Sequence, residues 1–447
     1  MKLQEKSGSL FRQIIAFSLP LMATALLQIL FNTADLAVVG QFSGSLATAA
    51  VGATSALINL IISLFMGLAS GVCVAAAQAY GAKEYDRVGR AASTGLIVGL
   101  ATGIAVGIAG FFCAGELLEW MDTPPEVLEG AKRYMKVYFL GVPGVLVYSF
   151  CSSVFRAVGD SKHPLYILAA AGAANVVLNI VFVAGFGMAE AGVALATSIT
   201  QTGSAVAVVW MLCRKACPWR LTRKGLRVDG ATLRQVLRIG LPAGIQGSLF
   251  SVSNVVLQSA VNSLGAAAVS ACAACNTIEN YAFFTTTQFN QTAVTFVGQG
   301  VGAHDMKKIK NTVRICIACV TVIGGVFGGL IILFREPLLK IFVPDSAEAI
   351  AIGMERIVVM GLTYILCAYM DVLSGGLRGL GVSLTPMLIT MVGIIGTRFF
   401  WVYAIFPSHH TLTELFVSYP VSWLLCVAAQ LPLFLHCRRK LERTLAE

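Results

Sequence analysis

The segments FRAVGDSKHP (residues 155–164) and LRGLGVSLTP (residues 377–386) decide how this chain is organised, because the second resembles the first. Arg156, Gly159 and Pro164 of the first segment align with Arg378, Gly381 and Pro386 of the second. The second segment begins 222 positions after the first (377 minus 155). Other pairs follow in the same order at nearly the same offset, namely Pro20 with Pro242, Asn32 with Asn254, Gln78 with Gln299 and Leu117 with Leu338. Matches that keep their order along the chain indicate an internal duplication. The chain is therefore predicted to consist of two similar halves.

The hydropathy of both halves predicts a membrane protein. Of the 447 residues, 57% are apolar and 12% are charged, about half the ~25% charged fraction of soluble domains. Apolar runs long enough to cross a bilayer, about 20 residues, occur at 14–39, 47–78, 91–112, 130–150, 164–185 and 191–213, and again at 237–262, 267–298, 313–334, 351–374, 385–406 and 413–435. We predict an all-α integral membrane fold of twelve transmembrane helices.

The predicted lobes are an N-terminal six-helix lobe over 1–213 and a C-terminal six-helix lobe with a basic tail over 237–447, joined by a basic cytoplasmic linker over 214–236. Because six is even, both lobes enter the membrane from the same side, and parallel repeats of this kind can enclose a central cleft. Basic residues gather before the first span, in alternate loops and after the last span, for example Lys83, Lys308 and Arg438. The positive-inside rule then places both termini in the cytoplasm.

Composition and motifs also exclude several function classes. The net charge of +10 is explained by this topology and by contact with anionic membrane lipids, so no nucleic-acid partner is expected. The sequence contains no G-x-x-x-x-G-K-[ST] loop, so ATP is not the direct energy source. The five His and twelve Cys residues form no metal-ligand or nucleophile motif. We expect no enzyme activity, no metal or cofactor other than a coupling ion, and a monomeric chain.

Acidic residues inside the predicted spans indicate function, because a carboxylate in lipid is costly unless it faces protein or water. Asp35 lies on one helix face with Gln28 and Asn32, at helical spacings of four and three residues. A partly buried carboxylate with amide neighbours can hold a proton or Na⁺, whereas a helix-end charge in interfacial water is the alternative interpretation. Asp35, Gln28 and Asn32 are therefore predicted to face a cavity.

Two further acids, Glu279 and Asp371, lie in the second half. Glu279 follows Asn276 in the most polar predicted span, which we interpret as the border of the substrate cavity. Glu279 would contact a cationic substrate or form a second coupling site, with helix packing as the alternative. Asp371 lies seven residues before Arg378, so it is either a cavity residue or half of an ion pair near the cytoplasmic surface.

The span at 237–262 repeats the polar stripe of the first span without its charge. Asn254 and Gln258 lie on one helix face and are predicted to line the cavity, together with Asn276 of the next span. Leu257 stands at the position that corresponds to Asp35 in the first half. The two halves are therefore predicted to share a scaffold and to differ in charge.

The repeated segments quoted above, together with Asn32 and Asp35, make the sequence resemble the multidrug and toxic compound extrusion (MATE) family of cation-coupled exporters over essentially the whole chain. The resemblance implies two six-helix lobes arranged in a V, export of small amphipathic and often cationic compounds, and drive by H⁺ or Na⁺. It also implies a cation-binding role for Asp35, extended to Asn175, Asn179 and Thr197. The matching segments are Ser18–Pro20 with Asn32 and Asp35, Gln78–Ala82, Phe155–Asp160, Asn175–Asn179, Gly240–Pro242, Gln299–Ala303 and Leu377–Gly381.

Two positions depart from the family pattern. The position of Asn179 is acidic in some members, and its amide here leaves Asp35 as the one carboxylate of the group. Other members carry a carboxylate on the first span of the second half, whereas residues 248–251 read SLFS here. Both departures leave open the identity of the coupling ion, H⁺ or Na⁺ near Asp35, and its stoichiometry.

The sequence thus predicts a secondary active multidrug exporter of the plasma membrane, which in bacteria is the inner membrane. It would antiport amphipathic organic compounds outward against inward H⁺ or Na⁺ by alternating access. The alternative is a lipid-linked oligosaccharide flippase of a related transporter group, which should line its cavity with several Arg or Lys residues. The predicted cavity faces instead hold acids and amides, and Arg398 alone lies well inside a span. A non-transporting scaffold or receptor would not need buried carboxylates.

Overall fold

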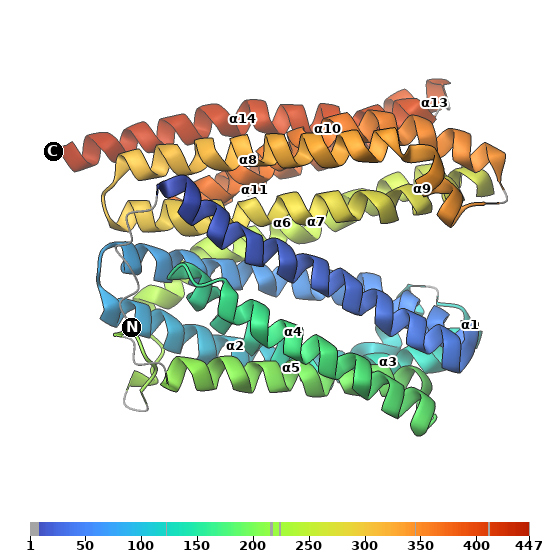
Figure 1. Ribbon diagram of the computed structural model, residues 1–447, viewed down its shortest axis with the longest axis horizontal. Helices are drawn as coiled ribbons and strands as arrows, with labels where there is room; N and C mark the ends of the chain where they lie inside the picture. Colours follow the sequence, from blue (N-terminus) through green and yellow to red (C-terminus); the bar gives the residue numbers. More distant parts are fainter. Residues whose placement is uncertain are drawn as a thin grey trace. The chain divides into compact units, whose positions relative to one another are not determined.

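The computed structural model describes residues 9–121, 123–214, 218–222, 225–344, 346–409 and 412–446 (Figure 1). The predicted all-α fold is confirmed, since the regular elements of these residues are all helices. They are α1 (Leu10–Gly81), α2 (Tyr85–Trp120), α3 (Pro125–Ala157), α4 (Lys162–Asn179), η1 (Ile180–Gly185), α5 (Ala189–Arg214), α6 (Gly230–Asn262), α7 (Ala266–Gly302), α8 (Met306–Leu333), α9 (Arg335–Phe342), α10 (Ala347–Gly379), α11 (Leu384–Thr390), η3 (Met391–Gly396), α12 (Thr397–Phe400), η4 (Trp401–Ile405), α13 (Phe406–His409) and α14 (Leu412–Ala446).

The predicted spans map onto these helices with three differences in detail. Nine helices of the described chain are long and apolar enough to cross a membrane. The number is ten if the two parts of α10, which is bent between Gly361 and Thr363, are counted as one span. The 72-residue α1 contains the first two predicted spans, which are separated at Gly44, where φ is +83°; glycine adopts this left-handed backbone without steric cost. The predicted span at 267–298 lies in α7, which is too polar to pass a hydropathy test.

Contacts divide the chain into two compact units, and their composition does not follow chain order throughout. The N-terminal unit includes Leu19–Gly244, and the C-terminal unit includes Ile245–Glu447 together with Gly8–Ser18. The start of α1 joins the C-terminal unit because the Phe17 ring lies 5.4 Å from that of Phe296 on α7. The Ser18 hydroxyl lies 2.9 Å from that of Thr292. The lobe boundaries predicted from sequence stay a prediction, and residues 215–217 and 223–224 of the linker lie outside the described residues.

Small residues allow the helices of each unit to pack closely. A Cβ atom added to Gly67 of α1 would lie 2.0 Å from the backbone nitrogen of Gly244 on α6, and one added to Gly103 of α2 would lie 2.6 Å from Cα of Pro143 on α3. Helices in lipid associate largely through such backbone approach, because the surrounding acyl chains are as apolar as the side chains. The abundant glycines therefore position the helices that carry the site.

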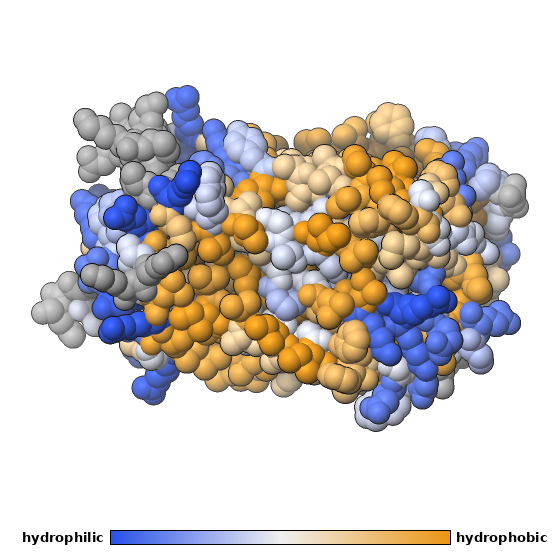
Figure 2. Space-filling view, turned by 90° about the horizontal axis from the view of Figure 1, so that it is seen from below, coloured by the Kyte–Doolittle hydropathy of each residue, from blue (hydrophilic) through white to orange (hydrophobic). Residues whose placement is uncertain are grey.

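The surface is apolar over the helices and polar at their ends. Figure 2 shows hydrophobic residues across the middle of the visible face and hydrophilic residues towards its two ends. Large apolar side chains such as Phe112 and Trp120 are 76% and 86% exposed. Exposed apolar area on this scale is typical of a face in contact with lipid.

Candidate functional site

The predicted cation site is assembled within the N-terminal unit from three helices. Asp35 lies on α1, Asn175 and Asn179 lie one turn apart on α4, and Thr197 lies on α5. The Asn179 side-chain amide donates to Asp35 Oδ1 at 2.5 Å and to Asn175 Oδ1 at 3.1 Å, while Asn175 Nδ2 donates to Thr197 Oγ1 at 3.3 Å. Both asparagines are buried. The four residues thus form one hydrogen-bonded group around a single carboxylate.

The amide of Asn175 lies beside Asp35 and can take either of two orientations there. In the orientation just described, Asn175 Oδ1 lies 2.8 Å from Asp35 Oδ1, and two oxygens at that distance need a proton between them. In the reversed orientation the Asn175 amide nitrogen donates to the carboxylate at 2.8 Å, but it then lies 3.1 Å from the Asn179 amide nitrogen. In this reversed orientation the Asn175 oxygen also accepts from the backbone N–H and the hydroxyl of Thr197, at 3.3 Å each, so the amide can donate directly to the Asp35 carboxylate.

A short π-helix follows the part of α4 that carries Asn175 and Asn179. The element η1 (Ile180–Gly185) continues α4 directly after Asn179, and η4 (Trp401–Ile405) occupies the corresponding place in the second half. Short π-helical stretches inside α-helices are often found at functional sites. Their presence in both halves shows that the duplication extends to this local irregularity.

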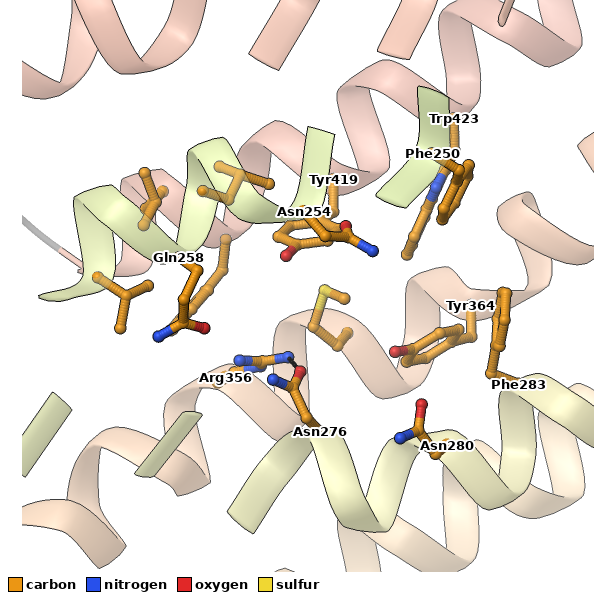
Figure 3. A pocket seen from close by; sticks show the side chains of 15 residues that line it. Phe250, Asn254, Gln258, Asn276, Asn280, Phe283, Arg356, Tyr364, Tyr419 and Trp423 are labelled. Carbon is orange, nitrogen blue, oxygen red and sulfur yellow. Dashed lines mark hydrogen bonds between the residues drawn. The ribbon is translucent and has the colours of Figure 1, made fainter. Parts of the chain in front are cut away.

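The C-terminal unit contains a separate pocket with a volume of about 290 Å³. Figure 3 shows it between α6, α7, α10 and α14, with aromatic rings and amides directed at the cavity. The residues that line it are Phe250, Asn254, Leu257, Gln258, Val261, Asn276, Asn280, Phe283, Arg356, Met360, Tyr364, Leu415, Phe416, Tyr419 and Trp423. Aromatic walls with a few polar groups are typical of sites for small organic ligands.

Glu279 is held in a buried ion pair and does not line this pocket. Arg356 of α10 donates to Glu279 Oε2 from Nη2 at 2.9 Å and to Oε1 from Nε at 3.3 Å. Tyr364 donates to Oε2 at 3.0 Å. The Glu279 and Arg356 side chains are 3% and 5% exposed. The carboxylate is thus neutralised by its own protein, which is the geometry of the helix-packing alternative.

Arg398 of α12 is fully buried beside the same pocket. Its Nη1 donates to Ser253 Oγ at 3.0 Å and to Asn254 Oδ1 at 2.9 Å. Its guanidinium carbon lies 4.3 Å from the centre of the Tyr419 ring, within cation–π range. Within the described part of the chain, no carboxylate pairs with it, and its Nε and Nη2 have no hydrogen-bond partner.

The remaining predicted residues are dispersed. Asn254, Gln258 and Asn276 line the C-terminal pocket as cavity residues, while Gln28 and Asn32 are exposed on α1 in the N-terminal unit. Asp371 is absent from the pocket lining.

The backbone carbonyl of Asp371 accepts from the Asn290 amide at 2.8 Å, and Arg378 donates to Gln246 Oε1 at 2.6 Å. Asp371 and Arg378 interact electrostatically, although no direct ion pair within 4.0 Å joins them among the described residues. The roles assigned to these residues remain predictions.

Sequence reasoning missed Arg356 and the aromatic lining. Arg356 lies near the start of the predicted span at 351–374 and is 4% exposed, which makes it a second buried arginine of this unit beside Arg398. Its pairing with Glu279 joins residues 77 positions apart, and no local spacing reveals it. The aromatic residues Tyr364, Tyr419 and Trp423 read as ordinary apolar positions until the fold places them together.

The fold and the two polar centres define a polytopic helical transporter, with one intramembrane carboxylate site in the first repeat and an aromatic pocket in the second. The sequence profile of the MatE family matches residues 20–183 and 242–403, and the chain belongs to this family of multidrug efflux transporters. The two matched ranges begin 222 positions apart (242 minus 20), which agrees with the offset of the internal repeat. The chain is accordingly a transporter and not an enzyme.

Individual relatives agree with this assignment. The probable multidrug resistance protein YoeA of Bacillus subtilis is 28% identical over 94% of this chain and 92% of its own length. The probable multidrug resistance protein NorM of Thermotoga maritima is 25% identical over 88% of this chain and 85% of its own length. A MOP superfamily transporter from Pyrococcus furiosus, described as having a binding pocket of reverse polarity, shares the fold with a TM-score of 0.89 at 20% identity, over 97% of this chain and 96% of that one.

Proposed function

We propose that this transporter is a secondary active exporter of the plasma membrane, with both termini in the cytoplasm. It exchanges small amphipathic, often cationic, organic compounds for an inward-moving cation by alternating access. The relatives named as multidrug resistance proteins support this substrate class. The observation that carries the coupling role is the carboxylate of Asp35, held between the amides of Asn175 and Asn179 on a neighbouring helix.

We propose H⁺ as the coupling ion at this group. The polar end of the Asn175 amide lies 2.8 Å from Asp35 Oδ1, so its NH₂ group can donate to an ionised Asp35 and its oxygen can accept from a protonated one. Loss of that proton forces the Asn175 amide to turn, which changes the contacts between α1, α4 and α5. A ligand shifts a conformational equilibrium only through different affinities for the two states, and this amide rearrangement supplies such a difference.

The flippase alternative gains no support from the C-terminal pocket. A pyrophosphate group would need several unpaired cationic side chains, since phosphate recognition relies on charge-assisted hydrogen bonds. The one Arg in the pocket lining, Arg356, already uses its guanidinium on Glu279 and Asn276. We therefore propose drug-like compounds, not lipid-linked sugars, as the cargo.

The test is transport of ethidium by the purified protein in liposomes, under an imposed pH gradient or an imposed Na⁺ gradient at constant ionic strength. We expect the pH gradient to drive accumulation, and Asp35→Asn to reduce that flux about 5–150-fold, the range of ordinary coupling free energies. Asp86→Asn, a matched change at an exposed position, should leave the flux unchanged.

Other outcomes of the same assay have separate meanings. Flux driven by Na⁺ alone would overturn the assignment of H⁺ as the ion. Wild-type flux in Asp35→Asn would overturn the coupling site. Absence of flux under either gradient would overturn the exchange mechanism itself.

A further inference from the structure

The pocket of the C-terminal unit occupies the place in the repeat that the cation site occupies in the N-terminal unit. Leu257, which lines the pocket, lies 222 positions after Asp35 (257 minus 35). Arg398 lies 222 positions after Val176 (398 minus 176), on the segment that corresponds to α4 with its two asparagines. The partly buried Asp35 of the first half thus has the apolar Leu257 as its counterpart in the second half. The second half instead has the buried Arg398, on the segment that corresponds to α4.

The charges around this pocket sum to an excess of positive charge. Glu279 and Arg356 neutralise each other at 2.9 Å. Arg398 has only neutral oxygens as hydrogen-bond acceptors, on Ser253 and Asn254, while its Nε and Nη2 have none within the described residues. A guanidinium remains charged at any physiological pH. A cation without a counter-charge thus lies directly behind the pocket wall, in contact with the lining residues Asn254 and Tyr419.

The arginines also fix which end of each amide faces the cavity. Arg398 donates to Asn254 Oδ1, and Arg356 donates to Asn276 Oδ1. A guanidinium has no acceptor, so each amide must turn its oxygen to the Arg and its NH₂ group away from it. Figure 3 shows the Asn254 nitrogen on the cavity side. Asn254 consequently presents a hydrogen-bond donor to a ligand, which is the reverse of what an organic cation requires.

The apolar part of the pocket selects for flat rings. The rings of Phe250 and Phe283 lie 6.4 Å apart, and those of Tyr364 and Trp423 lie 5.5 Å apart. Aromatic pairs at these separations favour a further ring in edge or offset contact. The ligand is thus expected to combine a planar aromatic body with a negatively charged acceptor group.

We propose that the C-terminal pocket is a binding site for aromatic organic anions, such as aromatic carboxylates. Its acceptor group lies against the NH₂ group of Asn254, and its charge is stabilised by Arg398 behind Asn254. This inference rests on the proposed export function and extends its substrates beyond cations. The two polar centres then serve opposite charges, with the coupling cation at Asp35 and the anionic compound at the pocket.

The test compares three probes of one shape and different charge on the purified full-length protein: 2-naphthoate, 2-naphthamide and 2-naphthylmethylammonium. Binding is followed by quenching of tryptophan fluorescence, with Trp423→Phe as the control that removes the reporter in the pocket wall. We expect the anion to bind at least about tenfold more tightly than the cation, because a unit charge within several Å is worth more than tenfold at an effective dielectric of ~20. Equal or tighter cation binding in the Trp423-dependent signal would overturn the proposal.

A variant pair tests the role of Arg398 directly. Arg398→Gln should reduce naphthoate affinity about tenfold or more and leave naphthamide affinity within about twofold, whereas Arg398→Lys should retain most of the preference for the anion. Unchanged naphthoate affinity in a folded Arg398→Gln protein would overturn the assignment. The probe comparison on the wild-type protein stands if that variant does not fold.

The outcome is separable from that of the transport assay. Ethidium flux that depends on Asp35, together with a pocket that does not prefer the anion, would refute this inference and leave the exchange function standing. Anion binding at the pocket without gradient-driven flux would refute the exchange function alone.

Discussion

Breaking the buried ion pair between Glu279 and Arg356 should destabilise the C-terminal unit strongly, and removing both charges should not. Arg356 contacts the carboxylate at 2.9 and 3.3 Å, a Coulomb attraction of about 4–6 kcal/mol at an effective dielectric of ~20. Truncating one partner leaves the other charge buried and unpaired, which costs about 3–5 kcal/mol. For a unit of roughly 200 residues that corresponds to a fall of about 6–20 °C in the unfolding midpoint.

The buried thiols of this protein provide the assay. Cys272 and Cys275 are 1% and 0% exposed beside Arg356, so a thiol-reactive fluorescent dye reports the loss of this packing on heating. The variants are Glu279→Gln, Arg356→Met and the double change. Each single variant should melt at a lower temperature, and the double variant should recover most of the loss, because a buried pair and an apolar replacement are close in free energy.

The exposed pair Glu336 and Lys340, which lies at 2.6 Å with both side chains more than half exposed, supplies the matched control. Glu336→Gln should not shift the midpoint, because exposed pairs are screened by water. A wild-type midpoint in Glu279→Gln, or a double variant less stable than both single variants, would refute the reasoning that these charges depend on each other.

Two further predictions concern helix packing and the linker. Gly67→Ala should lower the unfolding midpoint by roughly 2–12 °C, since its Cβ would lie 2.0 Å from the Gly244 backbone and overpacking costs about 1–3 kcal/mol. The control Gly52→Ala, at a position with open space around it, should leave the midpoint unchanged. Equal midpoints in the two variants would contradict the packing argument. The hydroxyl and backbone N–H of Thr232 donate to Asp229 at 2.6 and 2.8 Å and hold the pKa of Asp229 below its usual value. A carboxylate whose pKa is lower in the folded than in the unfolded state stabilises the fold above its unfolded pKa, and this stabilisation is lost as the pH falls. The difference in unfolding midpoint between wild type and Thr232→Val should therefore persist at pH 5–7 and shrink below about pH 4. A difference that does not depend on pH would contradict this prediction.

The prediction about Glu279 and Arg356 could not have been made from the sequence, for a physical reason. Hydropathy and the repeat are local or nearly local properties of the chain, so they predicted the helices, the duplication and the position of Asp35 inside a span. The grouping of Asp35 with Asn175 and Asn179 came from the family resemblance. Glu279 and Arg356 are 77 positions apart on two different helices. Their pairing depends on how those helices pack and on which side chains face each other between them. A carboxylate inside a span signals function whether or not a cation lies opposite, so the sequence could not separate a substrate contact from a buried pair.

The sequence by itself determined that the chain is a duplicated helical membrane transporter and that its halves differ in charge, with Asp35 in one and Leu257 in the other. It did so because lipid imposes long apolar helices and makes each intramembrane charge conspicuous. Only the tertiary structure decided the polarity of the second half. There the packing of α10 and α12 against α6 and α7 neutralises Glu279 and leaves Arg398 without a counter-charge. The same packing turns the amide donor of Asn254 towards an aromatic pocket.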